Sequence, residues 1–559
     1  MDWVQYYDVS VPMRDGVELV CDVRLPAGRG PFPIVLLRTP YNKNVHPEST
    51  RMENISQYLD HGYGMVIMDV RGKYESDGEF PIMAFRREGD DGADTVAWIA
   101  AQPWCNGKVA MTGASYCGYV QVYAAREHPA ALCAITPGVF GNDGFGNIVR
   151  RNGIPQMSLL IWALHHATGR VAKIFLLDWA KILFALPLRQ LVEATGMRRT
   201  AVFDRWMRHN HDNRFWHSMG KVEALADLRV PVLLTGGWFD LYSSAVVDSF
   251  VFLQQQPHLK GKIALMMGPW LHGMGARESG ELDFGPTAEV DITEVNRRWI
   301  DGWCREVEAD PIPPVRYFVM GVNEWRRAEQ WPPVATEEEF LLLACDCAAN
   351  GLTGDGRLDD CHGTAATDRY IYDPAAPVIN LGGNVLSFGE GMTAGPCDQR
   401  KMEERPDMLV YTGEVLDRPL EIIGFPRVEL YVASDAVDTD FVARLCDVYP
   451  DGRSINLSTG IVRMRYRNGF DREDPMAPGE IYRVEIRLDV TAAAFLPGHR
   501  LRLEIAGSSF PQFARNHNTG GDNWSDPEYV KATQTVYHSA EYPSRLLLPV
   551  NPAGAEDVF

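Results

Sequence analysis

Short apolar runs separated by amphipathic segments recur along the first quarter of the chain. The runs are residues 34–37, 65–68, 109–111 and 132–135. Continuously apolar stretches of this length are typical of strands buried on both faces, whereas residues 54–61 and 90–101 space their apolar side chains as helices do. Strands and helices that alternate in this way predict a mostly parallel sheet. Before them, residues 9–23 alternate around a turn, which predicts an antiparallel hairpin at the edge of the sheet.

The pattern changes twice further along the chain. Residues 145–228 favour helices without a convincing strand, the strand rhythm returns at 230–234 and 263–267, and from about residue 335 short alternating strands dominate. We therefore expect an α/β domain, a helical insertion, and a β-sandwich or jelly-roll domain. Their expected bounds are 1–144 with 229–335 for the α/β domain, 145–228 for the insertion, and 336–559 for the β domain.

Composition and charge narrow the class of protein. At 559 residues the chain is too long for a single hydrophobic core and should divide into several domains. Its hydrophobic content of 46% is high enough for each of them to fold. Because 54 basic residues face 74 acidic ones, the net charge of −20 argues against nucleic-acid or anionic-membrane partners. The apolar stretch 158–188 is interrupted by charged residues and predicts amphipathic helices rather than a membrane span. We expect a soluble protein acting on small molecules; whether it forms a homo-oligomer is left open.

Ten cysteines are spread along the chain without a Cys-x-x-Cys pair, so they indicate neither a disulfide framework nor a zinc site. Buried thiols in a reducing cytoplasm are the expectation, with no metal and no cofactor. The first residues lack a basic segment followed by an apolar core, which also favours a cytoplasmic protein; a signal peptide removed during maturation would leave the same start.

Ser115 lies between an apolar strand-like run and a helix-like run, in the segment Gly113-Ala114-Ser115-Tyr116-Cys117-Gly118. A serine on so tight a turn is pushed into the open, and the next backbone N–H can face an oxyanion formed there. Cys117 occupies the place of the second glycine in the usual G-x-S-x-G elbow. A small-residue turn without chemistry is the alternative, and Cys117 itself is better interpreted as a packing residue than as a nucleophile.

A serine nucleophile requires a base and a group that orients the base. Asp240 and His272 each follow an apolar strand by a few residues, as Ser115 does, and the ends of parallel strands meet at one edge of a sheet. The order Ser, Asp, His is the one that α/β-hydrolases use. Each residue alone has a structural explanation, as a loop aspartate or a structural histidine. Asp248 is a weaker substitute for Asp240, because it falls in the following helix.

Further motifs carry a resemblance to a known family. They are Arg38-Thr39-Pro40-Tyr41-Asn42-Lys43, Asp69-Val70-Arg71-Gly72, Gly237-Trp238-Phe239-Asp240, Gly268-Pro269-Trp270-Leu271-His272 and, near the end, Phe495-Leu496-Pro497-Gly498-His499-Arg500. With the segment around Ser115, they resemble the cocaine esterase and X-Pro dipeptidyl-peptidase (S15, CocE/NonD) family over essentially the whole chain. The resemblance implies an α/β-hydrolase fold with an inserted helical lid and a C-terminal β jelly-roll domain. The family elbow has the same glycine spacing as this chain.

The resemblance also implies roles for individual residues. Ser115, Asp240 and His272 would form the catalytic triad, and the Tyr41 phenol with the backbone N–H of Tyr116 would form the oxyanion hole. The acyl pocket would be lined by Trp162, Tyr242, Leu386 and Phe388, which favours an apolar or aromatic acyl group. Packing at the domain interfaces is the alternative role for these four side chains.

The expected activity is hydrolysis of a carboxylic ester, or of an amide, through an acyl-enzyme. The alternatives within the family are α-amino-acid ester hydrolase, β-lactam acylase and X-Pro dipeptidyl-peptidase, of which the first two hold a substrate ammonium with clustered carboxylates. Asp143 is the one carboxylate that the sequence places near the pocket mouth. A non-catalytic carbohydrate-binding or scaffold protein is the alternative from another class, and the intact set of Ser115, Asp240 and His272 argues against it.

Overall fold

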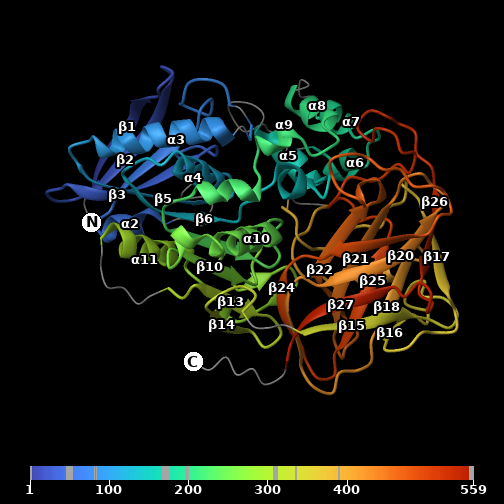
Figure 1. The fold of residues 1–559 in the computed structure, drawn as a ribbon. Coiled ribbons are helices and arrows are strands. Elements are labelled where there is room, and N and C mark those ends of the chain that lie inside the picture. Colours follow the sequence, from blue (N-terminus) through green and yellow to red (C-terminus); the bar gives the residue numbers. More distant parts are fainter. Residues whose placement is uncertain are drawn as a thin grey trace.

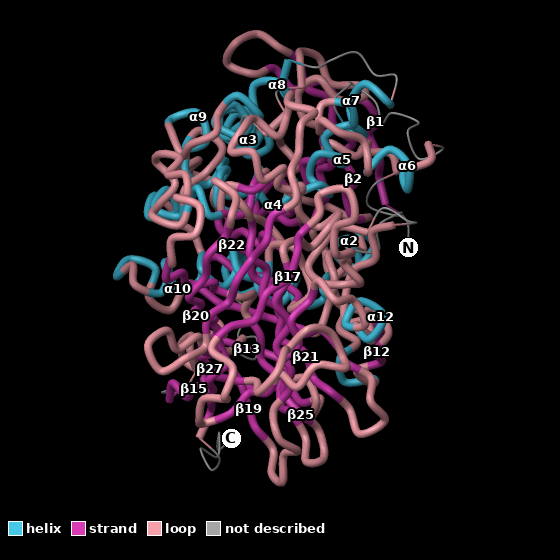
Figure 2. The backbone as a smooth tube through the Cα atoms, turned by 90° about the vertical axis from the view of Figure 1, so that its right-hand side faces the viewer, coloured by secondary structure: helices cyan, strands magenta, loops and turns pink. Residues whose placement is uncertain are grey.

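The computed structural model arranges the chain as two β-sheet domains with a group of helices where they meet (Figure 1). The structure describes residues 3–45, 54–80, 82–83, 85–166, 177–195, 201–305, 312–333, 337–387 and 391–552. In Figure 2 the strands fill the centre of the molecule, with most helices toward the top and others at both sides.

The first sheet has ten strands in the order β1-β2-β4-β3-β5-β6-β9-β10-β13-β14. Their bounds are β1 (Trp3–Pro12), β2 (Glu18–Pro26), β3 (Phe32–Thr39), β4 (Gly64–Asp69), β5 (Cys105–Ala114), β6 (Leu132–Gly138), β9 (Val232–Gly237), β10 (Ile263–Gly268), β13 (Val315–Val319) and β14 (Glu324–Ala328). The strands from β4 to β13 pair in parallel, and the edge pairs β1–β2 and β13–β14 are antiparallel. The predicted parallel sheet and edge hairpin are confirmed.

Helices cover both faces of this sheet. They are α3 (Phe85–Ala100), α4 (Tyr116–Arg126) and α10 (Ser243–Gln254) on one face, and α2 (Ile55–Asp60) and α11 (Ile292–Cys304) on the other. Along β3, Ile34 and Leu36 join the core under the first group, while Val35 and Leu37 join the core under the second. Because successive side chains of a strand point to opposite faces, a strand covered on both sides must be apolar throughout, which explains the continuous runs.

The insertion between β6 and β9 is mainly helical, as expected. It holds a short π-helix (Gly144–Ile148) and the helices α5 (Met157–His166), α6 (Trp179–Leu183), α7 (Gln190–Ala194), α8 (Ala201–Arg208) and α9 (Arg214–His217). A two-residue hairpin, β7 (Arg150–Arg151) with β8 (Ile154–Pro155), was not predicted, because strands this short leave no periodic signal. Helix α5 is buried on almost every side, in keeping with its nearly continuous apolar sequence. In Figure 1 the insertion lies above the junction of the two sheets.

The C-terminal domain is a 13-stranded, almost entirely antiparallel sheet system. Its strands are β15 (Glu337–Ala344), β16 (Arg357–Asp359), β17 (Thr367–Tyr372), β18 (Met408–Thr412), β19 (Leu420–Gly424), β20 (Arg427–Ser434), β21 (Asp440–Val448), β22 (Ser454–Arg463), β23 (Tyr482–Arg487), β24 (Thr491–Phe495), β25 (Arg500–Ala506), β26 (Ala532–Tyr537) and β27 (Arg545–Asn551). Together the two sheets confirm the predicted fold class of an α/β domain followed by a β-rich domain.

One expectation about the cysteines is wrong. Cys133 on β6 and Cys304 at the end of α11 form a disulfide with Cα atoms 5.9 Å apart, although 171 positions separate them in sequence. The pairing depends on how α11 packs across β6, and no local pattern reports that packing. Among the other cysteines, Cys347 and Cys361 are exposed and the remaining ones are buried.

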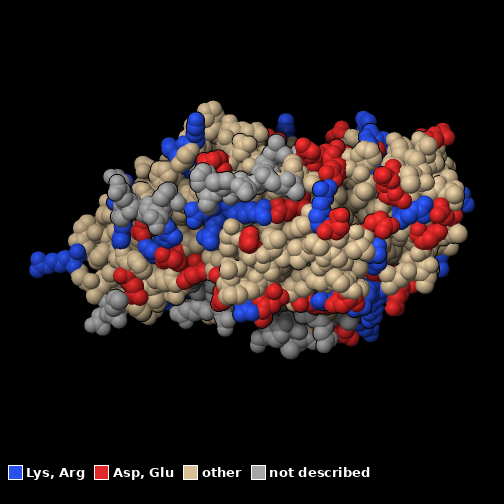
Figure 3. Space-filling model, turned by 90° about the horizontal axis from the view of Figure 1, so that it is seen from below, with Lys and Arg blue, Asp and Glu red and all other residues tan. Residues whose placement is uncertain are grey.

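Charged groups of both signs are interspersed on the face shown in Figure 3. Among the described residues, every helix is too short or too polar to cross a membrane.

Candidate active site

Ser115 occupies a strained turn between β5 and α4. Its backbone has φ 59° and ψ −126°, a positive φ that residues other than glycine rarely adopt. Its N–H donates to the carbonyl oxygen of Gly138 on the neighbouring strand β6, at 2.9 Å. The turn is therefore held against the sheet while the Ser115 side chain stays partly exposed. This geometry is that of a nucleophile elbow.

The small residues around Ser115 are required by close packing. A Cβ atom on Gly113 would lie 2.6 Å from the Cβ of Cys117, and one on Gly118 would lie 3.0 Å from the Gly138 oxygen. Cys117 is fully buried in that contact. Its thiol therefore packs inside the elbow, as expected, and is not placed to attack a substrate.

His272 and Asp240 are bonded to each other. Nδ1 of His272 lies 2.5 Å from Oδ2 of Asp240, which leaves Nε2 as the ring nitrogen available for proton transfer. Oδ1 of Asp240 accepts the backbone N–H of Tyr242 at 2.8 Å. The Asp240 side chain is fully buried, whereas 17% of the His272 side chain is exposed. The carboxylate is thus fixed from two directions, and the imidazole can be reached from outside.

The loop that carries His272 reaches the elbow. Met274, two residues after His272, packs over Gly138. A Cβ atom on Gly138 would lie 2.7 Å from the Cε of Met274. Gly138 is also the residue that accepts the Ser115 N–H. In the sheet, β5, β6, β9 and β10 are consecutive neighbours, and Ser115, Asp240 and His272 follow the first, third and fourth of them. The structure therefore brings the three predicted residues to one edge of the sheet.

Tyr41 follows β3 and its phenol lies beside the elbow. The phenol oxygen is in hydrogen-bonding contact with the Ser115 side chain, the Trp162 indole and the backbone N–H of Tyr116. Burial raises the pKa of Tyr41 above its ordinary value, so the phenol keeps its proton at neutral pH and remains a hydrogen-bond donor. Tyr41 and Tyr116 are hence next to the place where an oxyanion on a Ser115 adduct would form.

The lid helix α5 packs directly on both of these groups. The Trp162 ring stacks on the Tyr116 ring with centroids 5.9 Å apart, and the His166 ring meets the Tyr41 ring at 5.1 Å. The carbonyl of His166, at the end of the helix, accepts a hydrogen bond from the buried Lys73 ammonium at 3.3 Å. A helix from the insertion thus covers the site and is held by the α/β domain.

The Tyr116 side chain is fixed by a buried hydrogen bond. Its hydroxyl donates to Glu88 at 2.9 Å, and Glu88 forms a fully buried ion pair with Arg38 at 2.9 Å. The Tyr116 backbone N–H, which faces Tyr41, is therefore on a residue whose side chain cannot move freely.

Of the other three predicted pocket residues, one lies beside a candidate catalytic group. Tyr242 is buried, and its ring lies 6.1 Å from the His272 ring. Leu386 is partly buried against the main core. Phe388 lies outside the described residues. Two of the four, Trp162 and Tyr242, are therefore in contact with the candidate catalytic groups.

Asp143 and Asp248 are both neutralised by neighbours. Asp143 caps the π-helix through two backbone N–H groups and forms an ion pair with Lys221 at 2.6 Å. Asp248, on α10, pairs with Arg487 of the C-terminal domain at 2.7 Å. Both line a cavity of about 490 Å³ between the domains, whose walls include neither Ser115 nor His272. Asp248 is thus not an alternative partner for His272.

Comparisons with known proteins agree along the whole chain. Residues 15–274 match the model of the X-Pro dipeptidyl-peptidase (S15 family), and residues 308–547 match the X-Pro dipeptidyl-peptidase C-terminal non-catalytic domain. The chain is 36% identical to the cocaine esterase of a Rhodococcus species, over 97% of this chain and 98% of that protein. It belongs to the S15, CocE/NonD family of α/β-hydrolases.

Solved structures of the family superpose closely on this one. A structure described as an α-amino acid ester hydrolase has a TM-score of 0.87 and 28% identity, and covers 98% of this chain and 97% of its own. An aminopeptidase from a marine sediment archaeon, Thaumarchaeota archaeon, has a TM-score of 0.85 at the same identity and coverage. This protein is thus a serine hydrolase with the full two-domain architecture of the S15 family.

A contact between the C-terminal domain and the loop of Asp240 was not predicted from the sequence. The side-chain amide of Asn384, in a C-terminal loop, donates to the carbonyl oxygens of Trp238 at 2.8 Å and Asp240 at 3.0 Å, and to the Ser243 hydroxyl at 3.0 Å. The C-terminal domain therefore braces the loop that carries Asp240. No local pattern in the sequence signals that this amide crosses between domains.

Proposed function

We propose that this protein hydrolyses carboxylic esters through an acyl-enzyme formed on Ser115. The observation that carries the proposal is the placement of a strained, partly exposed serine, a histidine bonded to a buried carboxylate, and a protonated phenol at one edge of the sheet. Nucleophile, base and oxyanion donor are the parts that acyl transfer requires.

In the first half-reaction, Nε2 of His272 takes the hydroxyl proton of Ser115 while Oγ attacks the ester carbonyl. Asp240 keeps the Nδ1–H tautomer and stabilises the imidazolium. The carbonyl oxygen becomes an oxyanion that accepts hydrogen bonds from the Tyr41 phenol and the Tyr116 N–H. Collapse of this intermediate breaks the ester C–O bond, and the alcohol leaves with the proton from His272.

In the second half-reaction, a water molecule replaces the alcohol. His272 takes its proton, the hydroxide oxygen attacks the acyl carbonyl, and the same two donors stabilise the second oxyanion. Ser115 leaves with the proton and the carboxylic acid is released. The two half-reactions together consume the ester and one water molecule and release the alcohol and the carboxylic acid.

The direct test is Ser115→Ala assayed with a p-nitrophenyl ester. We expect kcat/KM to fall by about 10⁴-fold or more, because the variant cannot form the acyl-enzyme. Cys117→Ala is the matched control, since Cys117 is the neighbouring candidate nucleophile and lies buried in the elbow. The control should retain turnover within a few-fold of the wild type. Near-normal turnover of Ser115→Ala would refute the mechanism.

For the acyl group, we propose an apolar or aromatic chain. Trp162 and Tyr242 place aromatic surfaces beside the candidate catalytic groups. The relatives described as an α-amino acid ester hydrolase and an aminopeptidase act on substrates with an amino group. In this chain Asp143, the carboxylate considered for an ammonium, is paired with Lys221, and the Asp240 carboxylate is bonded to His272 while the Tyr242 ring lies beside it.

A matched pair of substrates tests this choice. We expect a phenylacetate ester to be hydrolysed at least about tenfold faster than the corresponding phenylglycine ester, because the ammonium loses hydration while Asp143 and Asp240 are already engaged by Lys221 and His272. The reverse preference would assign the protein to amino-acid ester hydrolysis and leave the serine mechanism intact.

A further inference from the structure

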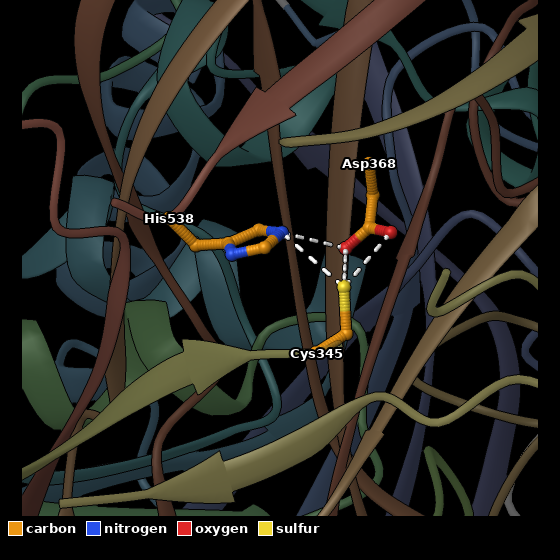
Figure 4. A group of neighbouring side chains, drawn as sticks. All are labelled: Cys345, Asp368 and His538. Atoms are coloured by element: carbon orange, nitrogen blue, oxygen red, sulfur yellow. Dashed lines mark hydrogen bonds and ion pairs between the residues drawn. The ribbon is translucent and has the colours of Figure 1, made fainter. Parts of the chain in front are cut away.

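A buried cluster in the C-terminal domain has the composition of a metal site. It consists of Cys345 directly after β15, Asp368 on β17 and His538 directly after β26. All three side chains are fully buried, and Figure 4 shows them pointing toward one common point. Thiolate, carboxylate and imidazole are the ligand types that zinc takes in proteins.

The separations of the three ligand atoms fit a single ion. Sγ of Cys345 lies 3.4 Å from both carboxylate oxygens of Asp368 and 3.6 Å from Nε2 of His538, and Nε2 lies 2.9 Å from Oδ2. A circle through atoms at these separations has a radius of about 1.9 Å, just below zinc bond lengths of about 2.0–2.3 Å. An ion slightly out of their plane would contact all three.

Hydrogen bonding leaves one of these contacts without a role. A single Nε2–H cannot be directed at both Oδ2, at 2.9 Å, and Sγ, at 3.6 Å. A cation at the centre would satisfy the three atoms together. Since the cysteine would bind as thiolate and release its proton, the charges of Cys345 and Asp368 would balance a divalent ion.

The surroundings also support Asp368 as a ligand. The Tyr411 hydroxyl donates to its Oδ2 at 2.7 Å and the Ala349 N–H donates to its Oδ1 at 2.8 Å. Hydrogen bonds of this kind orient ligating carboxylates in metalloproteins. The three residues come from chain segments up to 193 positions apart, so an ion would tie distant strands of the domain together.

We propose that Cys345, Asp368 and His538 bind one zinc ion that stabilises the C-terminal domain. The cluster lies in a different domain from Ser115, and the proposal is independent of the hydrolytic mechanism. Because the ligands are fully buried, the ion would enter during folding and would resist chelators in the native protein.

The test is the metal content of untagged protein purified without chelators. We expect about one zinc per chain by mass spectrometry of the elements, retained in EDTA at neutral pH and lost when EDTA is added to denatured protein. Refolding with Co²⁺ should give a thiolate-to-cobalt charge-transfer band. Less than a tenth of an equivalent of any transition metal, together with no such band, would overturn the proposal and leave a hydrogen-bonded network.

Two variants make the outcome specific. Cys345→Ser should reduce the zinc content at least tenfold, whereas a hydrogen-bonded network would tolerate a hydroxyl in place of the thiol. Cys397→Ser is the matched control, because Cys397 is also a buried cysteine of the C-terminal domain and belongs to no such cluster among the described residues. Equal zinc content in both variants would contradict the assignment, and the wild-type measurement decides the question if Cys345→Ser does not fold.

Discussion

The pairs Asp240–His272 and Asp368–His538 use the same kind of bond in different surroundings. In each, one ring nitrogen contacts a buried carboxylate, at 2.5 Å in the first and 2.9 Å in the second. His272 is partly exposed on a loop whose neighbour packs over the Ser115 elbow, while His538 is sealed inside the β domain beside a thiol. A histidine–carboxylate bond therefore does not by itself define a catalytic site. The imidazole must also be accessible to substrate and lie near a nucleophile.

The largest difference is expected when each carboxylate becomes an amide. Asp240→Asn should lower kcat by about 10⁴-fold, because the amide favours the wrong imidazole tautomer. Asp368→Asn should leave kcat within about threefold and lower the melting temperature instead, since it removes a buried charge that several donors surround. Steady-state kinetics and thermal unfolding of both variants measure this. A large loss of kcat in Asp368→Asn would break the comparison.

Tyr41→Phe should have the next largest effect. Loss of one oxyanion donor typically lowers kcat by about 10²–10³-fold, and KM should change little because the donor acts mainly in the transition state. Tyr63→Phe is a suitable control, as the Tyr63 hydroxyl bonds to Asp301 on α11 and not to a candidate catalytic group. A raised KM with an unchanged kcat in Tyr41→Phe would show that Tyr41 does not stabilise the oxyanion.

Much of this site could be predicted from sequence. Ser115, Asp240, His272 and Tyr41 each follow an apolar strand, and the parallel topology carries such positions to one edge. The disulfide, the Asn384 bridge and the Cys345 cluster could not be predicted in this way. Each depends on how segments far apart in the chain pack, and no spacing or periodicity encodes that contact.

Trp162→Phe tests whether the lid acts on the oxyanion hole or only on the acyl group. Phenylalanine keeps an aromatic ring against Tyr116 but loses the indole N–H that contacts the Tyr41 phenol. We expect kcat to fall by about tenfold, the scale of a lost hydrogen bond of about 1–1.5 kcal/mol. An unchanged kcat with a raised KM would make Trp162 a pocket wall only.

The expected effect at Lys73, whose ammonium donates to the last carbonyl of the lid helix, is on stability and not on turnover. Burial lowers the pKa of Lys73 to about 8, against about 10.4 in an unfolded chain. Between these values the unfolded state binds more protons, so Lys73 makes stability rise with pH by up to about 1.4 kcal/mol per unit. Below pH 8 both states are protonated and its contribution is constant.

Lys73→Met should remove this rise. Urea unfolding of the wild type and the variant between pH 7 and 10 measures it, and the wild type should gain stability relative to the variant as pH increases above 8. If the stabilities of the wild type and the variant change in parallel with pH, folding does not lower the pKa of Lys73.

The central claim is that Ser115 is the nucleophile at this sheet edge. The most direct measurement is labelling with a fluorophosphonate followed by peptide mass spectrometry. The account predicts one phosphonyl group per chain, on the peptide containing Ser115, with loss of esterase activity in step with labelling. Labelling of a different residue, or full inactivation of the enzyme without modification of Ser115, would contradict it.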